Sequence, residues 1–315
     1  MTKLRIVFMG TPGFAVGILD TILKNNFEVV GVITAADKPA GRGQQLKYSA
    51  VKQYALDHNL NLMQPPNLKD IDFIESLKAL NANLNVVVAF RMLPKVIWDM
   101  PEFGTFNLHA SLLPDYRGAA PINWAIINGE TKTGVTTFFI DDKIDTGAMI
   151  LSHEIEILPN ENAGNLHDKL MILGSQTVVE TLQLIVDGKA QTSIQHESVD
   201  IKTAHKLNKD NCKIDWSKSG LKIFNQIRGL SPFPTAWTYF NDHGVALAVK
   251  IDSANFEQEF HDFQIGKIIA NKKEIKIAVV DGFIVVQSLQ YPGKKKMKSF
   301  ELLNGMTFSE TAEAS

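Results

Sequence analysis

The chain has 315 residues, which is long for one domain and enough for two domains that each bury a core. Its composition, 45% hydrophobic and 21% charged, is ordinary for a globular protein and excludes a long disordered or fibrous chain. The formal net charge of -2 excludes a uniformly basic nucleic-acid binder. From Asp200 onward, however, 16 Lys and Arg residues outnumber 13 Asp and Glu residues, which hints at a polyanionic partner for this part of the chain.

The first half of the chain alternates apolar runs with helical periodicity. Apolar runs over 4–9, 28–34, 84–90 and 104–108 predict strands, and the patterns around 51–58 and 71–80 predict helices. Strands that are buried on both faces and alternate with helices are typical of a Rossmann-like, mostly parallel sheet. The runs 134–140 and 149–157 follow each other without a helix and predict antiparallel strands appended to that sheet. A long amphipathic helix is predicted over 163–186.

A second, smaller domain is predicted after a polar segment without periodicity. We place the first domain at 1–189, the linker at 190–208 and the second domain at 209–315. One helix, capped by Ser217 or Ser219, precedes five strand-like runs at 236–240, 245–251, 265–269, 275–280 and 283–289. Short strands separated by turn signals suggest a small OB-like β-barrel. The expected fold class is therefore α/β, a Rossmann-like domain followed by a barrel.

Cysteine and histidine usage bears on compartment and metal binding. The single cysteine, Cys212, cannot form an internal disulfide, which favours a reducing, cytoplasmic compartment. The histidines lack zinc-ligand spacing, so no metal is expected. The N-terminal apolar run is too short for a signal sequence, and no segment approaches the apolar length needed to cross a bilayer. We expect a cytoplasmic monomer without a membrane partner.

Three segments follow predicted strands, at the sheet edge where open α/β proteins bind ligands. The Gly10–Gly13 turn lacks the full glycine spacing of a dinucleotide site, and its proline withholds a backbone N–H from a phosphate. A tight turn explains it at least as well. Asn107 and His109 end another strand, where alternation puts both side chains on one face and Leu108 on the other. An amide and an imidazole so placed can face a developing oxyanion, although a strand-end histidine is more often structural.

The third segment is the turn that contains Asp145. A carboxylate there could orient His109 and favour its charged form. The competing interpretation is a turn aspartate that hydrogen-bonds its own backbone, which is common. Sequence spacing alone leaves both interpretations open.

Several motifs in one order resemble the folate-dependent formyltransferases. Asn107-x-His109 runs into Ala110-Ser111-Leu112-Leu113-Pro114 and Tyr116-Arg117-Gly118-Ala119-Ala120-Pro121, and Asp145-Thr146-Gly147 follows later. Further segments that start at Gly10, Asp37 and Gly293 narrow the resemblance to the methionyl-tRNA formyltransferase branch. The resemblance covers nearly the whole chain. Two departures are Ala110, where the family often has glycine, and Phe90-Arg91, where it has Tyr-Gly.

The resemblance implies transfer of a formyl group from 10-formyltetrahydrofolate to the amine of methionine esterified to initiator tRNA. Asn107, His109 and Asp145 match the family's catalytic set, with no metal. The resemblance further implies folate contacts, largely through backbone groups, at two places. These are Ser111, Leu112, Leu113 and Pro114 in the loop after the strand, and Val86, Val88 and Phe90 in the preceding strand.

Two basic segments are the expected tRNA-binding elements under this resemblance. The loop over 35–49 carries Lys38, Arg42 and Lys47, and disorder is its alternative explanation. Near the C-terminus lie Lys294, Lys295, Lys296 and Lys298, for which a solvated charge run is the alternative.

Three rival functions remain open at this point. A formyltransferase acting on a small amine, such as an amino sugar or a purine precursor, would keep the same three catalytic residues. A Rossmann-type oxidoreductase shares the fold class, and NAD(P)H binding would favour it. A non-catalytic RNA-binding protein would explain the barrel but leave Asn107, His109 and Asp145 without a role.

Overall fold

The computed structural model describes residues 3–40, 45–196 and 198–315, with 38–40 and 45–47 described by their backbone alone. The chain forms two compact units. Unit 1 comprises Met1–Gly118, Thr133–Ile155 and His167–Thr203, and unit 2 comprises Ala119–Lys132, Glu156–Leu166 and Ala204–Ser315. Short segments from the first half of the chain thus belong to the second unit, and the domain boundaries given above stay a prediction.

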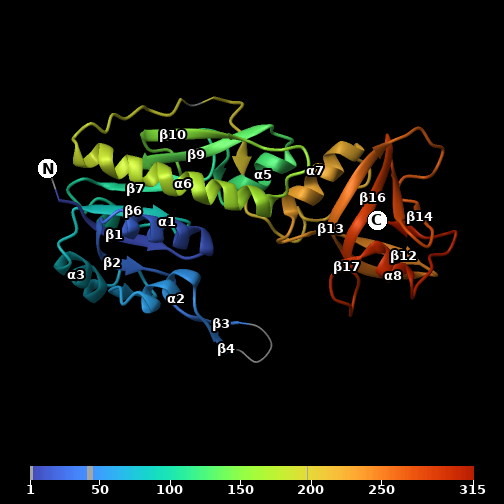
Figure 1. The fold of residues 1–315 in the computed structure, drawn as a ribbon, viewed down its shortest axis with the longest axis horizontal. Coiled ribbons are helices and arrows are strands. Elements are labelled where there is room, and N and C mark those ends of the chain that lie inside the picture. The colour runs from blue at the N-terminus through green and yellow to red at the C-terminus, as the bar shows by residue number, and fades with distance from the viewer. Residues whose placement is uncertain (1–2, 41–44, 197) are drawn as a thin grey trace. The chain divides into compact units, whose positions relative to one another are not determined.

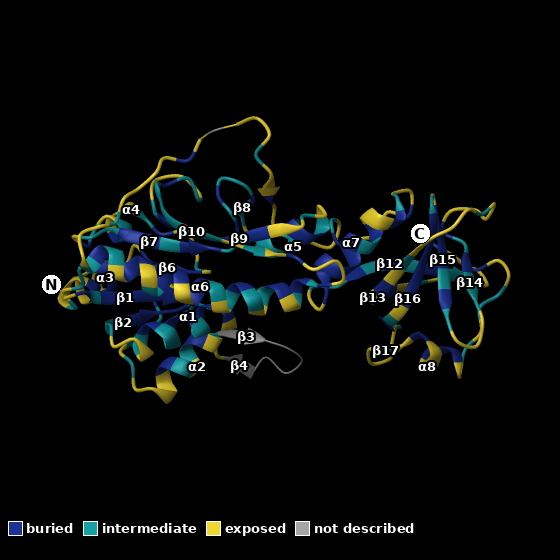
Figure 2. Cartoon of the chain, turned by 45° about the horizontal axis from the view of Figure 1, so that its top comes forward, coloured by how far each residue is buried: buried dark blue, intermediate teal, exposed yellow. Residues whose placement is uncertain are grey.

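Unit 1 is built on a mostly parallel sheet (Figure 1). Its strands lie in the order β10-β9-β7-β6-β1-β2-β5. The parallel members are β1 (Arg5–Gly10), β2 (Glu28–Ile33), β5 (Leu62–Met63), β6 (Leu84–Val88) and β7 (Thr105–His109). Strand β9 (Lys132–Phe139) pairs antiparallel with β7, and β10 (Met149–Glu156) lies beyond it. The central strands are buried along their length, as the dark blue ribbon of Figure 2 shows, which is why they read as continuous apolar runs.

Helices connect the parallel strands of unit 1. They are α1 (Gly13–Lys24), α2 (Ala50–Asp57), α3 (Ile71–Ala79) and the short α4 (Lys95–Trp98). Polar caps define two of the helix starts, because Ser49 accepts a hydrogen bond from Lys52 N at 3.0 Å and Asp70 accepts one from Phe73 N at 3.0 Å. The small strand pairs are β3 (Lys38–Ala40) with β4 (Gln45–Lys47), and β8 (Arg117–Gly118) with β11 (Thr203–Ala204).

The longest helix, α6, spans Ala163–Val186, the range predicted from its periodicity. Among the described residues it is the one helix long and apolar enough, by length and composition, to cross a membrane, so the expectation that no segment approaches that length was wrong. Core helices of soluble proteins meet the same criterion, and Leu170, Val178 and Leu182 of α6 are fully buried. A Cβ on Gly174 would lie 2.8 Å from Leu108 Cδ2, so α6 packs closely against β7.

Unit 2 contains an antiparallel barrel. Its strands are β12 (Ala236–Asp242), β13 (Val245–Gln258), β14 (Ile268–Ala270), β15 (Ile275–Val279), β16 (Gly282–Gln290), β17 (Met297–Lys298) and β18 (Glu313–Ala314). The helices of this unit are α5 (Pro121–Ile127), α7 (Gly220–Leu230) and α8 (Ser299–Leu303). Helix α7 buries Ile223, Ile227 and Leu230 in the barrel core, at the spacing of one helix face.

The barrel is nearly closed because its two edge strands meet. Ala314 N donates to Gly266 O at 2.7 Å, and Ile268 N donates to Ala312 O at 3.0 Å. Gly266 has a φ of +86°, and a Cβ there would lie 2.5 Å from Ala314 O. Glycine is therefore required where the segment before β14 meets β18 and closes the barrel.

The predicted fold class is confirmed for both halves, a mixed parallel sheet followed by an antiparallel barrel. The predicted strand over 245–251 is longer, because β13 continues to Gln258 and pairs with β16 beyond a register shift. The sequence pattern missed α4, α5 and β5, since segments of two to seven residues are too short to display a period.

The barrel core supplies a test of the fold. Replacing Phe240 with alanine should lower the free energy of unfolding by about 3–5 kcal/mol, because a large buried ring is removed. Its side chain is 1% exposed and packs on Phe308 with ring centroids 5.8 Å apart. Phe260, which is 90% exposed, is the matched control, and its replacement should change stability by about 0.5 kcal/mol at most. Chemical denaturation followed by tryptophan fluorescence measures both variants, and equal losses would contradict the placement of Phe240.

Candidate active site

The candidate site lies at the carboxyl end of β7. In this strand Leu108 is buried and meets Gly174 of α6, so Asn107 and His109 face the opposite side of the sheet, as strand alternation requires. Asn107 pairs with Val87 of β6 and Phe138 of β9, and His109 pairs with Thr136. Strands on both sides therefore fix the position of the two side chains.

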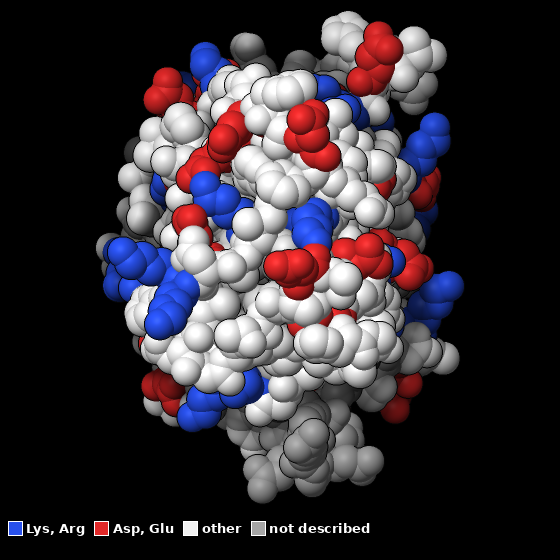
Figure 3. Space-filling model, turned by 90° about the vertical axis from the view of Figure 1, so that its right-hand side faces the viewer, with Lys and Arg blue, Asp and Glu red and all other residues white. Residues whose placement is uncertain are grey.

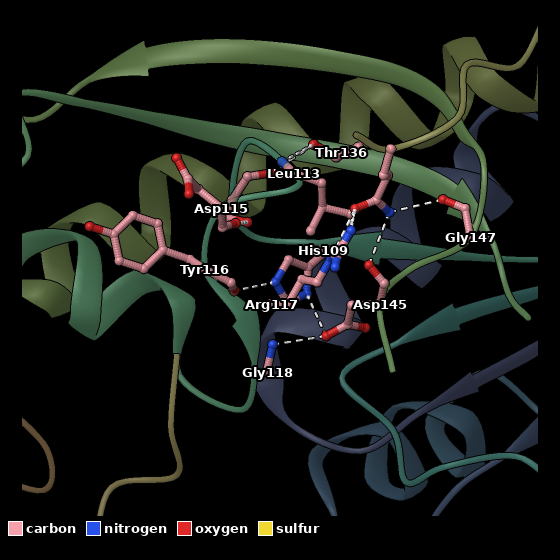
Figure 4. A network of polar contacts seen from close by, with 11 residues as sticks. His109, Leu113, Asp115, Tyr116, Arg117, Gly118, Thr136, Asp145 and Gly147 are labelled. Atoms are coloured by element: carbon pink, nitrogen blue, oxygen red, sulfur yellow. Dashed lines mark hydrogen bonds and ion pairs between the residues drawn. The ribbon is translucent and has the colours of Figure 1, made fainter. Parts of the chain in front are cut away.

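His109 is 6% exposed and both of its ring nitrogens face polar atoms (Figure 4). Nε2 lies 2.8 Å from the carbonyl oxygen of Tyr116, and Nδ1 lies 3.8 Å from Oδ2 of Asp145. A carbonyl oxygen can only accept, so Nε2 must carry the hydrogen of this bond. Nδ1 is then the nitrogen that can take up a proton, on the side of the ring that faces a carboxylate.

Asp145 is held by a distant part of the chain. Its Oδ2 accepts a hydrogen bond from Gly118 N at 2.9 Å, and its backbone has a φ of +55°. The aspartate that binds its own turn is instead Asp141, whose Oδ1 accepts from Lys143 N at 2.9 Å and from Thr146 Oγ1 at 2.8 Å. The contacts of Asp145 are thus those of an orienting carboxylate.

Asn107 presents an unused hydrogen-bonding group at the same place. Its Oδ1 is buried and has no hydrogen-bond partner among the described residues. A buried polar atom without a partner is costly, on the order of 1–3 kcal/mol, so such atoms often mark a ligand position. A donor that arrives at this oxygen would satisfy it. A half-turn of the amide would instead put the NH₂ group at this position, from which it could donate to an incoming oxygen.

The loop over 111–114 is fastened to the strand beside His109. Thr136 Oγ1 donates to Ser111 O at 2.8 Å and accepts from Leu113 N at 3.2 Å. Ser111 is fully buried and its hydroxyl donates to Asp115 O at 2.6 Å, whereas Leu112 and Pro114 are partly exposed. The loop therefore holds a defined backbone next to the three polar side chains.

The end of β6 borders the same edge of the sheet. Val86 and Val88 are fully buried, main chain included, as in an ordinary core strand. Phe90 packs against the apolar cluster of unit 1, and the Arg91 guanidinium donates to the carbonyls of Pro65 and Pro66. An open groove of about 690 Å³ lies beyond, lined by residues 66–69, 74 and 91–96.

Sequence reasoning missed three residues that support this site, Tyr116, Thr136 and Gln195. Tyr116 acts through its carbonyl oxygen, which no side-chain pattern reveals. Thr136 lies opposite His109 on the neighbouring strand, so the predicted pairing of strands could have found it. Gln195 donates to Asp145 O and Gly147 O, although it lies in the segment predicted as a linker.

Near the start of the loop over 35–49, Asp37 is hydrogen-bonded by two side chains from outside the loop. The Lys52 ammonium hydrogen-bonds Asp37, and Gln64 Nε2 donates to the other carboxylate oxygen at 2.9 Å. The pKa of Asp37 lies below its ordinary value, mainly because of the hydrogen bond from Lys52 and next because of the hydrogen bond from Gln64. Lys38 and Lys47 are backbone partners in the register of β3 with β4, while predicted Arg42 lies outside the described residues.

The C-terminal lysines lie at the turn between β16 and β17 in unit 2. Lys294, Lys295 and Lys298 are exposed, whereas Lys296 Nζ lies 3.2 Å from Asp252 Oδ2. On the face drawn in Figure 3, Lys and Arg side chains are interspersed with Asp and Glu rather than gathered into one broad positive field. Any polyanion contact here would therefore depend on a few lysines.

The Asp145 turn provides a stability test. Replacing Gly147 with alanine should destabilise the protein by about 1–3 kcal/mol through overpacking. A Cβ at this position would lie 1.7 Å from Phe139 O, which is backbone and cannot move aside. Gly13 is the control, because nothing lies within 4 Å of its Cβ position. Chemical denaturation compares the two variants, and an unchanged midpoint for Gly147→Ala would argue against this turn geometry.

Comparison with known proteins identifies the family. The chain matches the family described as Formyl transferase over residues 4–182 and the family described as Formyl transferase, C-terminal domain, over residues 206–307. A protein of Flavobacterium johnsoniae named Methionyl-tRNA formyltransferase is 69% identical over 99% of both chains. A protein of the same name from Bacteroides fragilis is 51% identical over 98% of this chain and 96% of its own.

Solved structures agree on the fold. The sugar 3N-formyl transferase WlaRD is 24% identical, with a TM-score of 0.65 over 94% of this chain and all of its own. HypX from Aquifex aeolicus is 17% identical, with a TM-score of 0.65 over 96% of this chain and 47% of its own. Matches to the family over both parts of the sequence, together with relatives more than half identical over its full length, establish that this chain belongs to the formyltransferase family.

Proposed function

We propose that this protein transfers the formyl group of 10-formyltetrahydrofolate to the free amino group of methionine esterified to initiator tRNA. The observation that carries the proposal is the convergence of the Asn107 amide, the His109 imidazole and the Asp145 carboxylate at the end of β7. Relatives named methionyl-tRNA formyltransferase support this acceptor over a small amine.

The Asn107 amide stabilises the reacting carbonyl. Attack of a neutral amine on the formyl carbon places negative charge on the formyl oxygen. With its NH₂ group turned toward that oxygen, Asn107 donates a hydrogen bond that becomes stronger as the charge develops. One such donor is worth roughly 3–4 kcal/mol. The amide oxygen has no hydrogen-bond partner among the described residues, so no bond to that oxygen opposes a half-turn of the amide.

His109 and Asp145 handle the proton. As the new C–N bond forms, the amine becomes cationic and must lose a proton, while the departing N10 must gain one when its bond to the formyl carbon breaks. Nδ1 of His109 is free to accept the proton and deliver it, since Nε2 donates to Tyr116 O. The carboxylate 3.8 Å away favours the transient imidazolium.

The folate is bound, in this proposal, beside the loop over 111–114 and the end of β6. Backbone groups there are held by Thr136 and by strand pairing, and the ring nitrogens of a pterin need such fixed donors and acceptors. Ser111, Leu112, Leu113, Pro114 and Phe90 remain the proposed folate-binding residues. Val86 and Val88 were predicted with them, and a folate reaches their backbone only by uncovering the end of β6.

The acceptor tRNA is bound by basic side chains of two segments. Lys38, Arg42 and Lys47 are the proposed contacts in the loop over 35–49. The Lys52 pairing with Asp37 neutralises the carboxylate at the base of this loop, which favours approach of a phosphate. Lys294, Lys295, Lys296 and Lys298 are the proposed contacts of unit 2. The proposal places the protein in the cytoplasm as a monomer.

Substitution of the two proton-handling residues tests the catalytic assignment. His109→Ala and Asp145→Asn should each lower kcat by roughly 10²–10⁴-fold, the range of general acid–base catalysis, while tRNA binding stays nearly unchanged. Transfer of labelled formyl groups from 10-formyltetrahydrofolate to charged initiator tRNA measures kcat. His243→Asn is the control, because this histidine is 78% exposed in a hairpin turn. Near-normal turnover of both variants would refute the assignment, and label found only on small amines would refute the acceptor.

Salt dependence tests the tRNA contacts. Each phosphate neutralised on a duplex lowers the slope of log affinity against log salt by about 0.9. Lys294→Ala and Lys295→Ala should therefore each make the slope shallower by about that amount. Lys78→Ala is the control, because this lysine pairs with Glu75 at 2.8 Å on α3. Filter binding at several salt concentrations gives the slopes, and slopes unchanged from the unsubstituted protein would rule out these contacts.

A further inference from the structure

Gln195 is a buried side chain whose four hydrogen-bonding positions are all occupied at the candidate active site. It is 5% exposed. Its Nε2 donates to Asp145 O and to Gly147 O, each at 2.9 Å. Its Oε1 accepts from Nε and Nη2 of Arg117, at 3.0 and 2.7 Å. A glutamine with this full set of bonds is held in one orientation and holds its partners in turn.

The chain around Gln195 is attached to unit 1 at two further points. On one side, Ser193 and Met149 exchange backbone hydrogen bonds of 2.9 and 2.8 Å at the start of β10. On the other side, Tyr116 N donates to Lys202 O at 2.6 Å, and Lys202 N donates to Asp115 Oδ1 at 3.0 Å. The segment around Gln195 is therefore hydrogen-bonded to other residues of unit 1 on both sides of Gln195.

Three consecutive residues connect Gln195 to the reactive groups. The carbonyl of Tyr116 accepts from His109, the guanidinium of Arg117 donates to Gln195, and the N–H of Gly118 donates to the Asp145 carboxylate. Gln195 closes the ring by holding the backbone of Asp145. The carboxylate is thus fixed from both ends, by Gly118 at its oxygen and by Gln195 at its main chain.

The position of Asp145 needs such support. Its φ of +55° lies in the left-handed region, which non-glycine residues rarely adopt without restraint. Its Oδ2 is 3.8 Å from His109 Nδ1, so a small displacement of the turn would remove the carboxylate from the imidazole. Misplacement of a reacting group by about 1 Å can lower a rate by roughly 10²-fold.

We propose that Gln195 is a positioning residue for formyl transfer, which acts by holding the Asp145 turn against His109. The inference rests on the proposed function and adds a residue to it. Gln195 hydrogen-bonds neither Asn107 nor His109, so its effect must pass through its partners, and we assign it to the Asp145 turn rather than to Arg117. A residue that merely stabilised the fold would act on the amount of folded protein and leave the turnover of folded molecules unchanged.

Two substitutions separate the bonds that Gln195 makes. Gln195→Met removes all of them at similar size. Gln195→Glu keeps an acceptor for Arg117 but replaces the donor to Asp145 O and Gly147 O with a second oxygen. Both variants should lower kcat by roughly 10²-fold, with KM for the folate and for the tRNA changed by less than about threefold. A Gln195→Glu enzyme with full kcat would overturn the inference, because the contact with Arg117 alone would then suffice.

A double-mutant cycle identifies the residue through which Gln195 acts. In the Asp145→Asn background, Gln195→Met should lower kcat by less than about threefold more, since residues that act as one unit are not additive. Full additivity would overturn the inference. Gln183→Met is the matched control, because Gln183 is exposed on α6 and donates only to Asp187 Oδ1 at 2.9 Å. Thermal melting of each purified variant confirms that rates refer to folded protein.

Failure of the inference differs from failure of the proposed function. An impaired Asp145→Asn enzyme with an unimpaired Gln195→Met enzyme overturns only the role of Gln195. Full turnover in Asp145→Asn overturns the catalytic assignment of Asp145 and, with it, any role that passes through this residue.

Discussion

The antiparallel pairing of β9 with β7 is the constraint on which the candidate active site depends. The pairing sets Thr136 opposite His109 and Phe138 opposite Asn107. Strand β9 runs from His109 back toward the start of β7, where Phe139 lies opposite Phe106. The segment after β9 then returns, so that Asp145 accepts a hydrogen bond from Gly118 N and lies within 3.8 Å of the imidazole. Strand pairing and this returning segment together join residues 36 positions apart in the sequence.

Main-chain groups supply most of the orientation around these side chains. His109 bonds to Tyr116 O, Asp145 to Gly118 N, and Gln195 to Asp145 O and Gly147 O. Backbone positions are fixed by the fold and lose no rotamer freedom when they form such bonds. The reactive imidazole and carboxylate therefore start in place, while the Asn107 oxygen remains without a partner among the described residues. In the proposed mechanism the Asn107 amide turns, so that its NH₂ group and not this oxygen meets the developing oxyanion.

How far the sequence predicts this arrangement depends on whether the information is local. Strand alternation placed Asn107 and His109 on one face, and the apolar repeat of α6 gave its bounds as 163–186. Spacing alone left Asp145 open between an orienting carboxylate and an ordinary turn aspartate, and the resemblance to a family favoured the first. The contacts of Gln195 join segments 50 and 78 residues away and have no local pattern, so a polar stretch without period was interpreted as a linker. Likewise, a solvated charge run was the alternative interpretation of the C-terminal lysines, and no local pattern indicated the ion pair of Lys296 with Asp252.

Phe90-Arg91 stands where the family has Tyr-Gly, at the edge of the sheet that is proposed to bind the folate. The contacts of these two residues show how the fold accommodates the change. The Arg91 guanidinium donates to the Pro65 and Pro66 carbonyls, which fastens the loop after β6 to the segment after β5. Phe90 packs against the apolar cluster of unit 1, and Ala89 before it takes a φ of +48°. The side chains of Phe90 and Arg91 thus contact the protein's own core and backbone, and the proposed folate position beside the 111–114 loop keeps its main-chain groups. In the proposed site the pterin is recognised by those main-chain groups, so we expect a change of side chain here to be tolerated better than a change of backbone path.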